Sequence, residues 1–178
     1  IGVHTAKQDS SPMILFVGQI GTQMKGREAF QEIDYESAFN DVAKWTVEIN
    51  DVDRIPEIIA RAWFTAISGR PGPVVVALPE NILTKNSSAS PLTSAIVVEK
   101  TVPSSTSIDK VDRLLTESDF PLIIIGGTNW DRSGQNALKE FAESSKIPVI
   151  TAFRYQDQFD NFSPAFCGEA GVGMPSHV

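Results

Sequence analysis

The sequence contains a single cysteine, Cys167, among its 178 residues, and this scarcity excludes several kinds of site. One cysteine can form neither an intramolecular disulfide nor the paired-cysteine knuckle of a zinc site. The two histidines, His4 and His177, stand at opposite ends of the sequence, and no cluster of histidine, cysteine and carboxylate residues has metal-site spacing. Because disulfides are rare in reducing compartments, the composition favours a cytoplasmic protein.

Basic charge and long apolar runs are scarce as well. The formal net charge is −7, whereas a surface that binds nucleic acid needs clustered lysine and arginine. No apolar run approaches the roughly 20 residues that a membrane-spanning helix requires. Neither a P-loop nor the nucleophile elbow of a serine hydrolase occurs in the sequence. We therefore expect neither nucleic acid nor a membrane as a partner.

Short apolar runs without polar alternation are what the sequence does contain. Residues 74–78 (VVVAL) form such a run, which is typical of a strand covered on both faces of a parallel sheet. Glycines and prolines in residues 69–73 predict a turn before this strand, and Pro79 ends it because proline cannot donate to a ladder. Residues 13–17 (MILFV) predict a second buried strand of the same kind.

Helical and strand patterns alternate between these two runs. Residues 35–42 carry apolar side chains at helical spacing, and residues 44–49 alternate like a half-buried strand. We expect Asp51 or Asp53 to cap the next helix, with Pro56 in its first turn. The predicted apolar stripe of that helix consists of Ile55, Ile58, Ile59, Ala62, Trp63 and Ile67. This order predicts an α/β fold with a parallel sheet.

The composition changes after this region. Residues 84–107 are rich in serine, threonine and proline, which predicts an extended linker with one short strand at residues 95–98.

A second α/β unit is expected to follow the linker. Residues 108–115 predict a helix, and the apolar residues 122–125 predict a buried strand that ends at two glycines. Ser133 or Gly134 is expected to open a further helix, and residues 148–151 predict the next strand. The whole chain is thus predicted to be α/β, with Rossmann-like doubly wound units in two incomplete domains. Asp157, Asp160 and Glu169 are expected to be solvated loop charges.

Both ends of the sequence look interrupted. The first residues resemble the end of a helix running into a turn, and the last residues carry no capping pattern or polar tail. A fragment of a longer protein is the expectation.

Several segments occur in an order and spacing similar to those of one family: SSPMILFVGQI, GREAFQEIDYESAF, AKWTVEI, RIPEIIARAWFTAISGRPGPVVVALPENIL, PLIIIGG and KIPVITAF. They resemble the thiamine-diphosphate-dependent acetolactate synthase group of 2-oxo-acid enzymes. The resemblance covers nearly the whole chain and is most specific in residues 11–83. It implies that residues 1–84 form the latter part of the domain that binds the cofactor's pyrimidine. Residues 85–106 would then be a linker, and residues 107–178 the first part of the central domain.

The resemblance also implies a chemistry. Thiamine diphosphate supplies an ylid that adds to the carbonyl of a 2-oxo acid such as pyruvate, and CO₂ is then lost. In the family the activating glutamate lies upstream of these residues, and the Mg²⁺-binding motif lies downstream. Neither Glu28 nor Glu32 is predicted to replace that glutamate, so we expect no catalytic residue and no activity in these residues alone. The implied intact protein is a homodimer or homotetramer that acts in branched-chain amino acid biosynthesis.

Three residues match positions that line the substrate approach in the family. Phe30 and Gln31 belong to the FQE segment, where Gln31 could donate a hydrogen bond to a substrate carboxylate or carbonyl. Lys44 matches a lysine at the same entrance, where its ammonium could attract an anionic 2-oxo acid. The alternatives are a loop glutamine that caps backbone groups and a solvated lysine at the start of a strand. Gly21 and Thr22 stand where many relatives carry proline and basic residues, which leaves the exact substrate open.

FAD is a further cofactor that the resemblance leaves open. Acetolactate synthases of this group bind it in the central domain without net redox chemistry, and the matching positions here are Gly126, Gly127, Ala152, Phe153 and Gly168. Two glycines after a strand are, however, also ordinary turn chemistry. Residues 153–161 differ from the usual synthase sequence, and Ala170 replaces a family histidine. Vestigial or absent flavin binding therefore stands as the alternative.

Other functions remain open beside a synthase. A related decarboxylase or acetyltransferase on the same scaffold would share these segments. From different classes, a non-catalytic nucleotide-binding module and a plain structural remnant are also compatible with the sequence.

Overall fold

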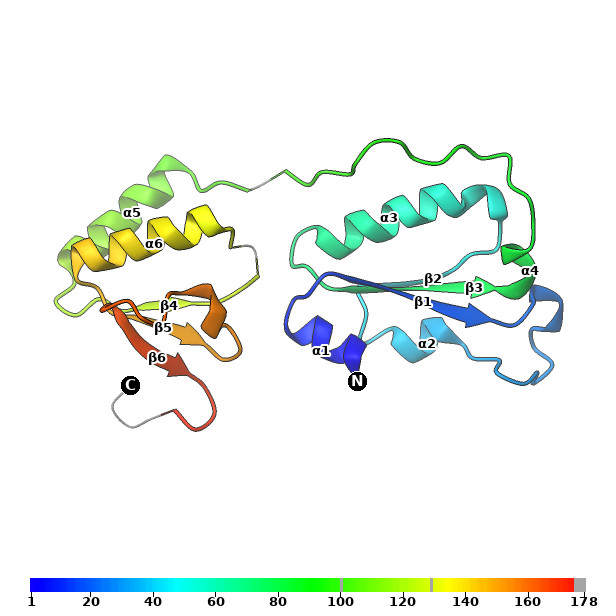
Figure 1. Cartoon of the computed structure of the whole chain (residues 1–178), viewed down its shortest axis with the longest axis horizontal. Coiled ribbons are helices and arrows are strands. Elements are labelled where there is room, and N and C mark those ends of the chain that lie inside the picture. Colours follow the sequence, from blue (N-terminus) through cyan, green and yellow to red (C-terminus); the bar gives the residue numbers. More distant parts are fainter. Residues whose placement is uncertain (100, 129, 175–178) are drawn as a thin grey trace. The chain divides into compact units, whose positions relative to one another are not determined.

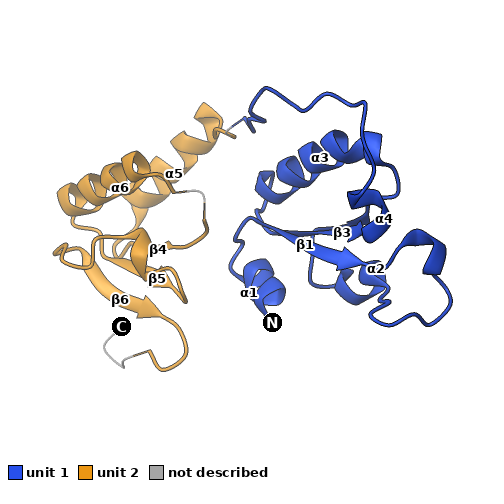
Figure 2. Ribbon diagram, turned by 45° about the vertical axis from the view of Figure 1, so that its right-hand side comes forward, with its two compact units in different colours: residues 1–99 blue, residues 100–178 orange. Residues whose placement is uncertain are grey.

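The computed structural model describes residues 1–99, 101–128 and 130–174. The chain divides into two compact units, Ile1–Glu99 and Lys100–Val178 (Figures 1 and 2). Each unit contains one three-stranded parallel sheet with helices packed on it. The predicted fold class, α/β with parallel Rossmann-like units, is confirmed.

The first sheet has the strand order β1-β3-β2, from Met13–Gln19, Pro73–Pro79 and Trp45–Glu48. The central strand is β3, in which Val74, Val75 and Val76 are fully buried. Val75 packs in one core cluster and its two neighbours face the other side, because successive side chains of a strand alternate between faces. The continuous apolar run therefore predicted this strand and its burial on both faces.

The outer strand β1 is less covered than its sequence suggested. Ile14 packs with the core beneath one helix, but Phe16 is 50% exposed. A strand with one neighbour leaves its outer residues open to solvent, and β1 pairs only with β3 among the described strands. The expectation of a fully buried strand at residues 13–17 is corrected accordingly.

Helices cover both faces of the first sheet. The helix α3 (Ile55–Ile67) lies on one side, and α1 (Gly2–Gln8) and α2 (Tyr35–Phe39) lie on the other (Figure 1). A short helix, α4 (Glu80–Leu83), follows β3 directly. This two-sided covering is the doubly wound arrangement that places loops at the carboxyl edge of the sheet.

The helix α3 differs from its prediction in two details. Its buried residues are Ile58, Ala62 and Ala66, whereas Trp63 is 52% exposed although it belongs to the predicted stripe. Asp51 caps a 3₁₀ turn, η2 (Val52–Arg54), instead of the helix itself. Asp53 does not cap α3 either.

The carboxylate of Asp53 holds the chain after α4. Asp53 Oδ1 accepts hydrogen bonds from the hydroxyl of Ser87 at 2.8 Å and from the amide of Ser88 at 2.9 Å. Beyond this contact, the described residues between α4 and the next helix contain no helix or strand, so the strand predicted at residues 95–98 is wrong.

The second sheet has the order β4-β5-β6, formed by Ile123–Ile125, Val149–Ala152 and Phe166–Ala170. The helix α6 (Arg132–Ser145) contributes Ala142 and Leu138 to the core, while α5 (Ser105–Glu117) has no buried residue. A 3₁₀ turn, η3 (Gln156–Gln158), follows β5. The strand β6 was not predicted, because its sequence FCGEA contains no apolar run.

Acidic residues in the second unit make specific contacts. Asp131, and not Ser133 or Gly134, caps α6, and its carboxylate accepts a hydrogen bond from the Gly134 amide at 2.8 Å. Asp160 pairs with the Lys139 ammonium at 2.7 Å, and Glu169 accepts from the Arg154 amide at 3.1 Å. Asp157 and Asp160 are exposed, as expected. Glu169 instead lies half-buried in β6, so the expectation of a solvated loop charge is wrong for Glu169 alone.

Among the described residues, no helix combines the length and the apolar character that crossing a bilayer would require.

Candidate functional site

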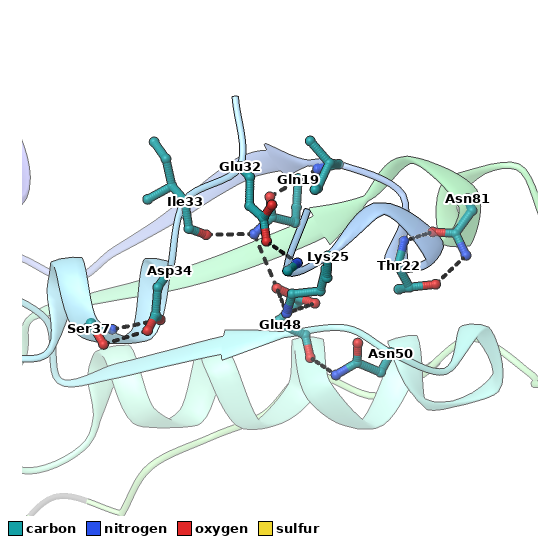
Figure 3. A network of polar contacts seen from close by, with 12 residues as sticks. Gln19, Thr22, Lys25, Glu32, Ile33, Asp34, Ser37, Glu48, Asn50 and Asn81 are labelled. Atoms are coloured by element: carbon teal, nitrogen blue, oxygen red, sulfur yellow. Dashed lines mark hydrogen bonds and ion pairs between the residues drawn. The ribbon is translucent and has the colours of Figure 1, made fainter. Parts of the chain in front are cut away.

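The candidate site lies at the carboxyl edge of the first sheet, where residues 20–34 connect β1 to α2. In open α/β sheets this edge is where ligands bind. The segment contains the FQE residues, and it lies next to the carboxyl end of β2 at Glu48 (Figure 3). Its conformation is set by a network of polar contacts from neighbouring strands.

Gln19, the last residue of β1, anchors the end of this loop. Its side chain is 5% exposed, and its amide nitrogen donates to the Ile33 carbonyl at 2.8 Å and to Glu48 Oε2 at 3.3 Å. Its amide oxygen accepts from the Ile20 backbone at 3.0 Å. Each polar atom of this buried amide is therefore satisfied, and Gln19 joins the loop to two strands.

Two further contacts fix the first half of the loop. The Lys25 ammonium lies 2.8 Å and 3.0 Å from the two carboxylate oxygens of Glu48, and this hydrogen bond raises the pKa of Lys25. Thr22 and Asn81 bond each other reciprocally, from the Thr22 amide to Asn81 Oδ1 at 2.8 Å and from Asn81 Nδ2 to the Thr22 hydroxyl at 2.9 Å. Strand β2 and helix α4 thus both hold residues 22–25 (Figure 3).

The FQE residues form a tight turn. The Glu32 amide donates to the Ala29 carbonyl at 3.0 Å, which places Phe30 and Gln31 at the two central positions. Gln31 has a φ of +69°, as the third residue of a type II turn requires. Phe30 is 89% exposed, and Gln31 is exposed as well. Both predicted substrate-contacting side chains therefore stand at a turn on the carboxyl edge, available to a ligand.

A hollow of about 330 Å³ lies beside this turn. Its lining includes Lys25, Glu32, Asp34, Tyr35 and Glu48. Asp34 caps α2 by accepting from the Ser37 amide at 3.0 Å, and the Tyr35 hydroxyl donates to the Gly18 carbonyl at 3.0 Å. The polar lining is thus largely engaged in holding the loop.

Lys44 lies at the other end of the sheet. Its amide donates to the Pro73 carbonyl at 2.7 Å, at the amino ends of β2 and β3. Its ammonium donates to the Thr65 carbonyl and, at 2.8 Å, to the Ser68 carbonyl, both at the carboxyl end of α3, and burial lowers the pKa of this lysine. The first unit therefore brings Phe30 and Gln31 together but does not bring Lys44 to them.

The glycine pair of the second unit follows β4. A Cβ on Gly126 would lie 3.2 Å from the Ala152 Cβ and 3.6 Å from Tyr155, so packing alone calls for glycine there. The Gly126 carbonyl accepts from the Trp130 indole at 3.0 Å. Gly127 has a φ of +84°, which favours glycine without any ligand.

The remaining predicted flavin contacts are partly dispersed. Ala152 ends β5 and Phe153 follows it, but Gly168 lies within β6 opposite Ile150. A hollow of about 690 Å³ lies beside Gly126, Gly127 and the start of α6. The Asp131 carboxylate already accepts from the Gly134 amide there, and a phosphate would meet this negative charge. These residues do not fit a flavin pyrophosphate at the start of α6.

No group of three histidine, cysteine or carboxylate residues that could hold a metal ion occurs in the part of the chain that the structure describes.

The residues that hold the site were not predicted from the sequence. Gln19 could have been noticed as a polar residue that ends an apolar strand. Glu32 stands beside Gln31 in the FQE segment, and nothing in its spacing indicates that its carboxylate returns to the backbone before the turn. Asn81 is separated from Thr22 by 59 positions, so only the parallel pairing of β1 with β3 explains their contact.

Comparisons with known proteins cover both units. Residues 108–178 match the family described as thiamine pyrophosphate enzyme, central domain. The probable acetolactate synthase large subunit of Methanocaldococcus jannaschii is 33% identical over 177 residues, which cover 96% of this chain and 30% of that protein.

Two further relatives agree. The mitochondrial acetolactate synthase catalytic subunit of Saccharomyces cerevisiae is 32% identical over 172 residues, covering 88% of this chain and 24% of that protein. The acetolactate synthase isozyme 2 large subunit of Escherichia coli is 27% identical over 171 residues, covering 96% of this chain and 31% of that protein. The chain thus spans between 24% and 31% of the length of these three relatives.

Proposed function

We propose that the chain belongs to the acetolactate synthase group of thiamine pyrophosphate enzymes, and that the natural protein decarboxylates pyruvate or a similar 2-oxo acid and forms a carbon–carbon bond. The observation that carries this proposal is the identity of 33% across 96% of the chain with a probable synthase large subunit. The exposed turn at the carboxyl edge of the first sheet supports it, because ligands of α/β folds bind at that edge.

In this proposal Phe30 and Gln31 form part of the wall that the substrate meets. The amide of Gln31 can donate to a substrate carboxylate or carbonyl, and the exposed ring of Phe30 can contact its apolar part. For Lys44 the same role would require its ammonium to leave the carbonyls of Thr65 and Ser68. Gln31 is therefore the residue on which the substrate contact is best tested.

The cofactor of the proposed reaction is thiamine diphosphate with Mg²⁺, which supplies the nucleophilic carbon that attacks a 2-oxo acid. Among the described residues, no three histidine, cysteine or carboxylate side chains lie close enough together to hold a metal ion. We propose that other segments of the natural protein bind the diphosphate and Mg²⁺. Residues 1–84 would complete a pyrimidine-binding domain and residues 107–178 a central domain. We assign no role to FAD, because the start of α6 does not suit its pyrophosphate.

Assembly and compartment are also proposals. A homodimer or homotetramer would suit a large catalytic subunit, and a role in branched-chain amino acid biosynthesis would suit an acetolactate product. The lone cysteine favours the cytoplasm, whereas the yeast relative is a mitochondrial protein.

The proposal is tested by assaying the natural full-length protein with a panel of 2-oxo acids in the presence of thiamine diphosphate and Mg²⁺. Acetolactate formed from pyruvate supports the synthase, and free aldehyde without condensation indicates the related decarboxylase. Gln31→Ala is expected to raise KM by about tenfold, the effect of losing one hydrogen bond to a charged group. An unchanged KM would remove Gln31 from the substrate site.

A further inference from the structure

We infer that Glu32 is a positioning residue that holds the Phe30–Gln31 turn in the conformation in which Gln31 meets the substrate. This inference rests on the proposed function, since it assigns the turn to the substrate site. The carboxylate of Glu32 is engaged by the backbone of its own loop.

The Glu32 carboxylate bonds two backbone amides of its own loop. Glu32 Oε1 accepts from the Gly26 amide at 2.6 Å, and Oε2 accepts from the Ala29 amide at 3.2 Å. One side chain therefore closes the loop of residues 26–32 onto itself, with one oxygen for each amide. Hydrogen bonds to an ionised carboxylate are among the stronger ones in proteins, and these two lower the pKa of Glu32.

The backbone of this loop needs the two hydrogen bonds of the Glu32 carboxylate, which we call the Glu32 brace. Gln31 has a φ of +69° and Glu28 a φ of +53°, and both are uncommon for residues that carry a Cβ. A loop with two such residues adopts its shape only when other contacts determine it.

The other side-chain contacts of this loop lie before or after the Phe30–Gln31 turn. Lys25 pairs with Glu48 before it, and Gln19 holds the Ile33 carbonyl after it. In the described part of the chain, Glu32 is the one residue whose side chain bonds residues 26–31. Between these fixed ends, the Phe30–Gln31 turn is held by its own backbone hydrogen bond, from the Glu32 amide to the Ala29 carbonyl, and by the Glu32 carboxylate.

Glu28 provides a matched control. It lies in the same loop, carries the same charge and is exposed, but no hydrogen bond to its carboxylate is found among the described residues. Changing Glu28→Ala removes a charge at nearly the same place without removing the brace.

The test uses the natural full-length protein and its KM for pyruvate. Glu32→Ala is expected to raise KM by about tenfold with kcat changed by less than about threefold, while Glu28→Ala changes neither. In a Gln31→Ala background, Glu32→Ala is expected to raise KM by much less than tenfold, because the main contact that the turn presents is already lost. Additive effects on KM, or an unchanged KM in Glu32→Ala, would overturn the inference.

Amide hydrogen exchange gives a readout that does not depend on activity. The amides of Gly26 and Ala29 are expected to exchange about tenfold faster in Glu32→Ala, and not in Glu28→Ala. Equal exchange in both variants would overturn the inference. If the wild-type protein turns over no 2-oxo acid, the proposed function fails, while the exchange result still decides whether Glu32 braces the loop.

A conservative variant covers the case in which Glu32→Ala does not fold. Glu32→Gln keeps the size of the side chain and one acceptor oxygen. Its amide exchange rates and its KM are therefore expected to lie between the values of the wild type and those of a protein that has lost both carboxylate hydrogen bonds. Wild-type values for both readouts in Glu32→Gln would contradict a role for the ionised carboxylate.

Discussion

At the scale of single residues, polar side chains at both edges of the first sheet bond backbone groups. Gln19 and Glu32 shape the loop at the carboxyl edge, and Lys44 holds the end of α3 at the amino edge. Each of these three side chains could hydrogen-bond a substrate, but in the structure each bonds backbone groups of the protein instead. Phe30 and Gln31 lie exposed on the turn that the contacts at the carboxyl edge hold, and they are the proposed substrate contacts.

The first residue-scale prediction concerns Lys44. Lys44→Met removes the ammonium from the carbonyls at the end of α3, and we expect the free energy of unfolding to fall by about 1 kcal/mol, the usual value of a hydrogen bond. Urea unfolding followed by tryptophan fluorescence measures this loss, and Lys85→Met is the control at an exposed position. KM for pyruvate should stay unchanged. A higher KM at unchanged stability would instead return Lys44 to the substrate entrance.

The second residue-scale prediction is a pH dependence. The pKa of Glu32 is lowered in the folded protein from its ordinary value of 4.5, chiefly by the hydrogen bond from the Gly26 amide. A lowered folded pKa means that the carboxylate stabilises the loop above the ordinary pKa, and that this contribution is lost as the pH falls through the folded value. The exchange protection of the Gly26 amide, corrected for intrinsic rates, should therefore hold down to pH 4.5 and disappear only below it. Protection that is already lost near neutral pH would contradict this sign.

At the scale of elements, β3 organises the first unit, because its side chains enter the cores on both faces of the sheet. The parallel neighbours β1 and β2 take their register from it, and the loop after β1 reaches α4 through Thr22 and Asn81. Pairing with the buried central strand thus places the loop after β1, which contains the candidate site, at the carboxyl edge of the sheet.

The prediction at this scale compares two identical substitutions. Val75 is fully buried in β3, so Val75→Ala should lower the free energy of unfolding by about 2 kcal/mol, from lost burial and the cavity left behind. Val97 is 78% exposed in the same unit, and Val97→Ala should change stability by less than about 0.5 kcal/mol. Urea unfolding of the two variants measures both. Equal losses would contradict the central position of β3.

The elements were predictable to the extent that local patterns decide them. The run VVVAL was enough for β3, since a continuous apolar run bounded by glycine and proline has few other solutions. Periodicity placed Trp63 in the stripe of α3 but could not show that this side chain is about half exposed among the described residues. The strand β6 owes its place to pairing with β5, which its own residues do not indicate.

The candidate site was predictable only in part. The family resemblance singled out Phe30 and Gln31, and the structure places both on one exposed turn. It also grouped Lys44 with them, although strand direction puts Lys44 at the opposite edge. The bracing role of Glu32 depends on the path of the loop in space, which no spacing rule gives.

At the scale of the whole molecule, two α/β units together align with between 24% and 31% of the length of three acetolactate synthase relatives. In the proposed function, Phe30 and Gln31 of the first unit form part of the substrate wall. Under the proposed function, other segments of the natural protein bind the cofactor, and we expect residues 1–178 alone to give no turnover.

The most direct test of the central claim is the formation of acetolactate from pyruvate by the natural full-length protein, with and without thiamine diphosphate and Mg²⁺. Residues 1–178 alone are assayed in parallel. We expect acetolactate only from the full-length protein and only when the cofactor is added. Turnover by the 178 residues alone, or no cofactor-dependent reaction of the full-length protein with any 2-oxo acid, would contradict it.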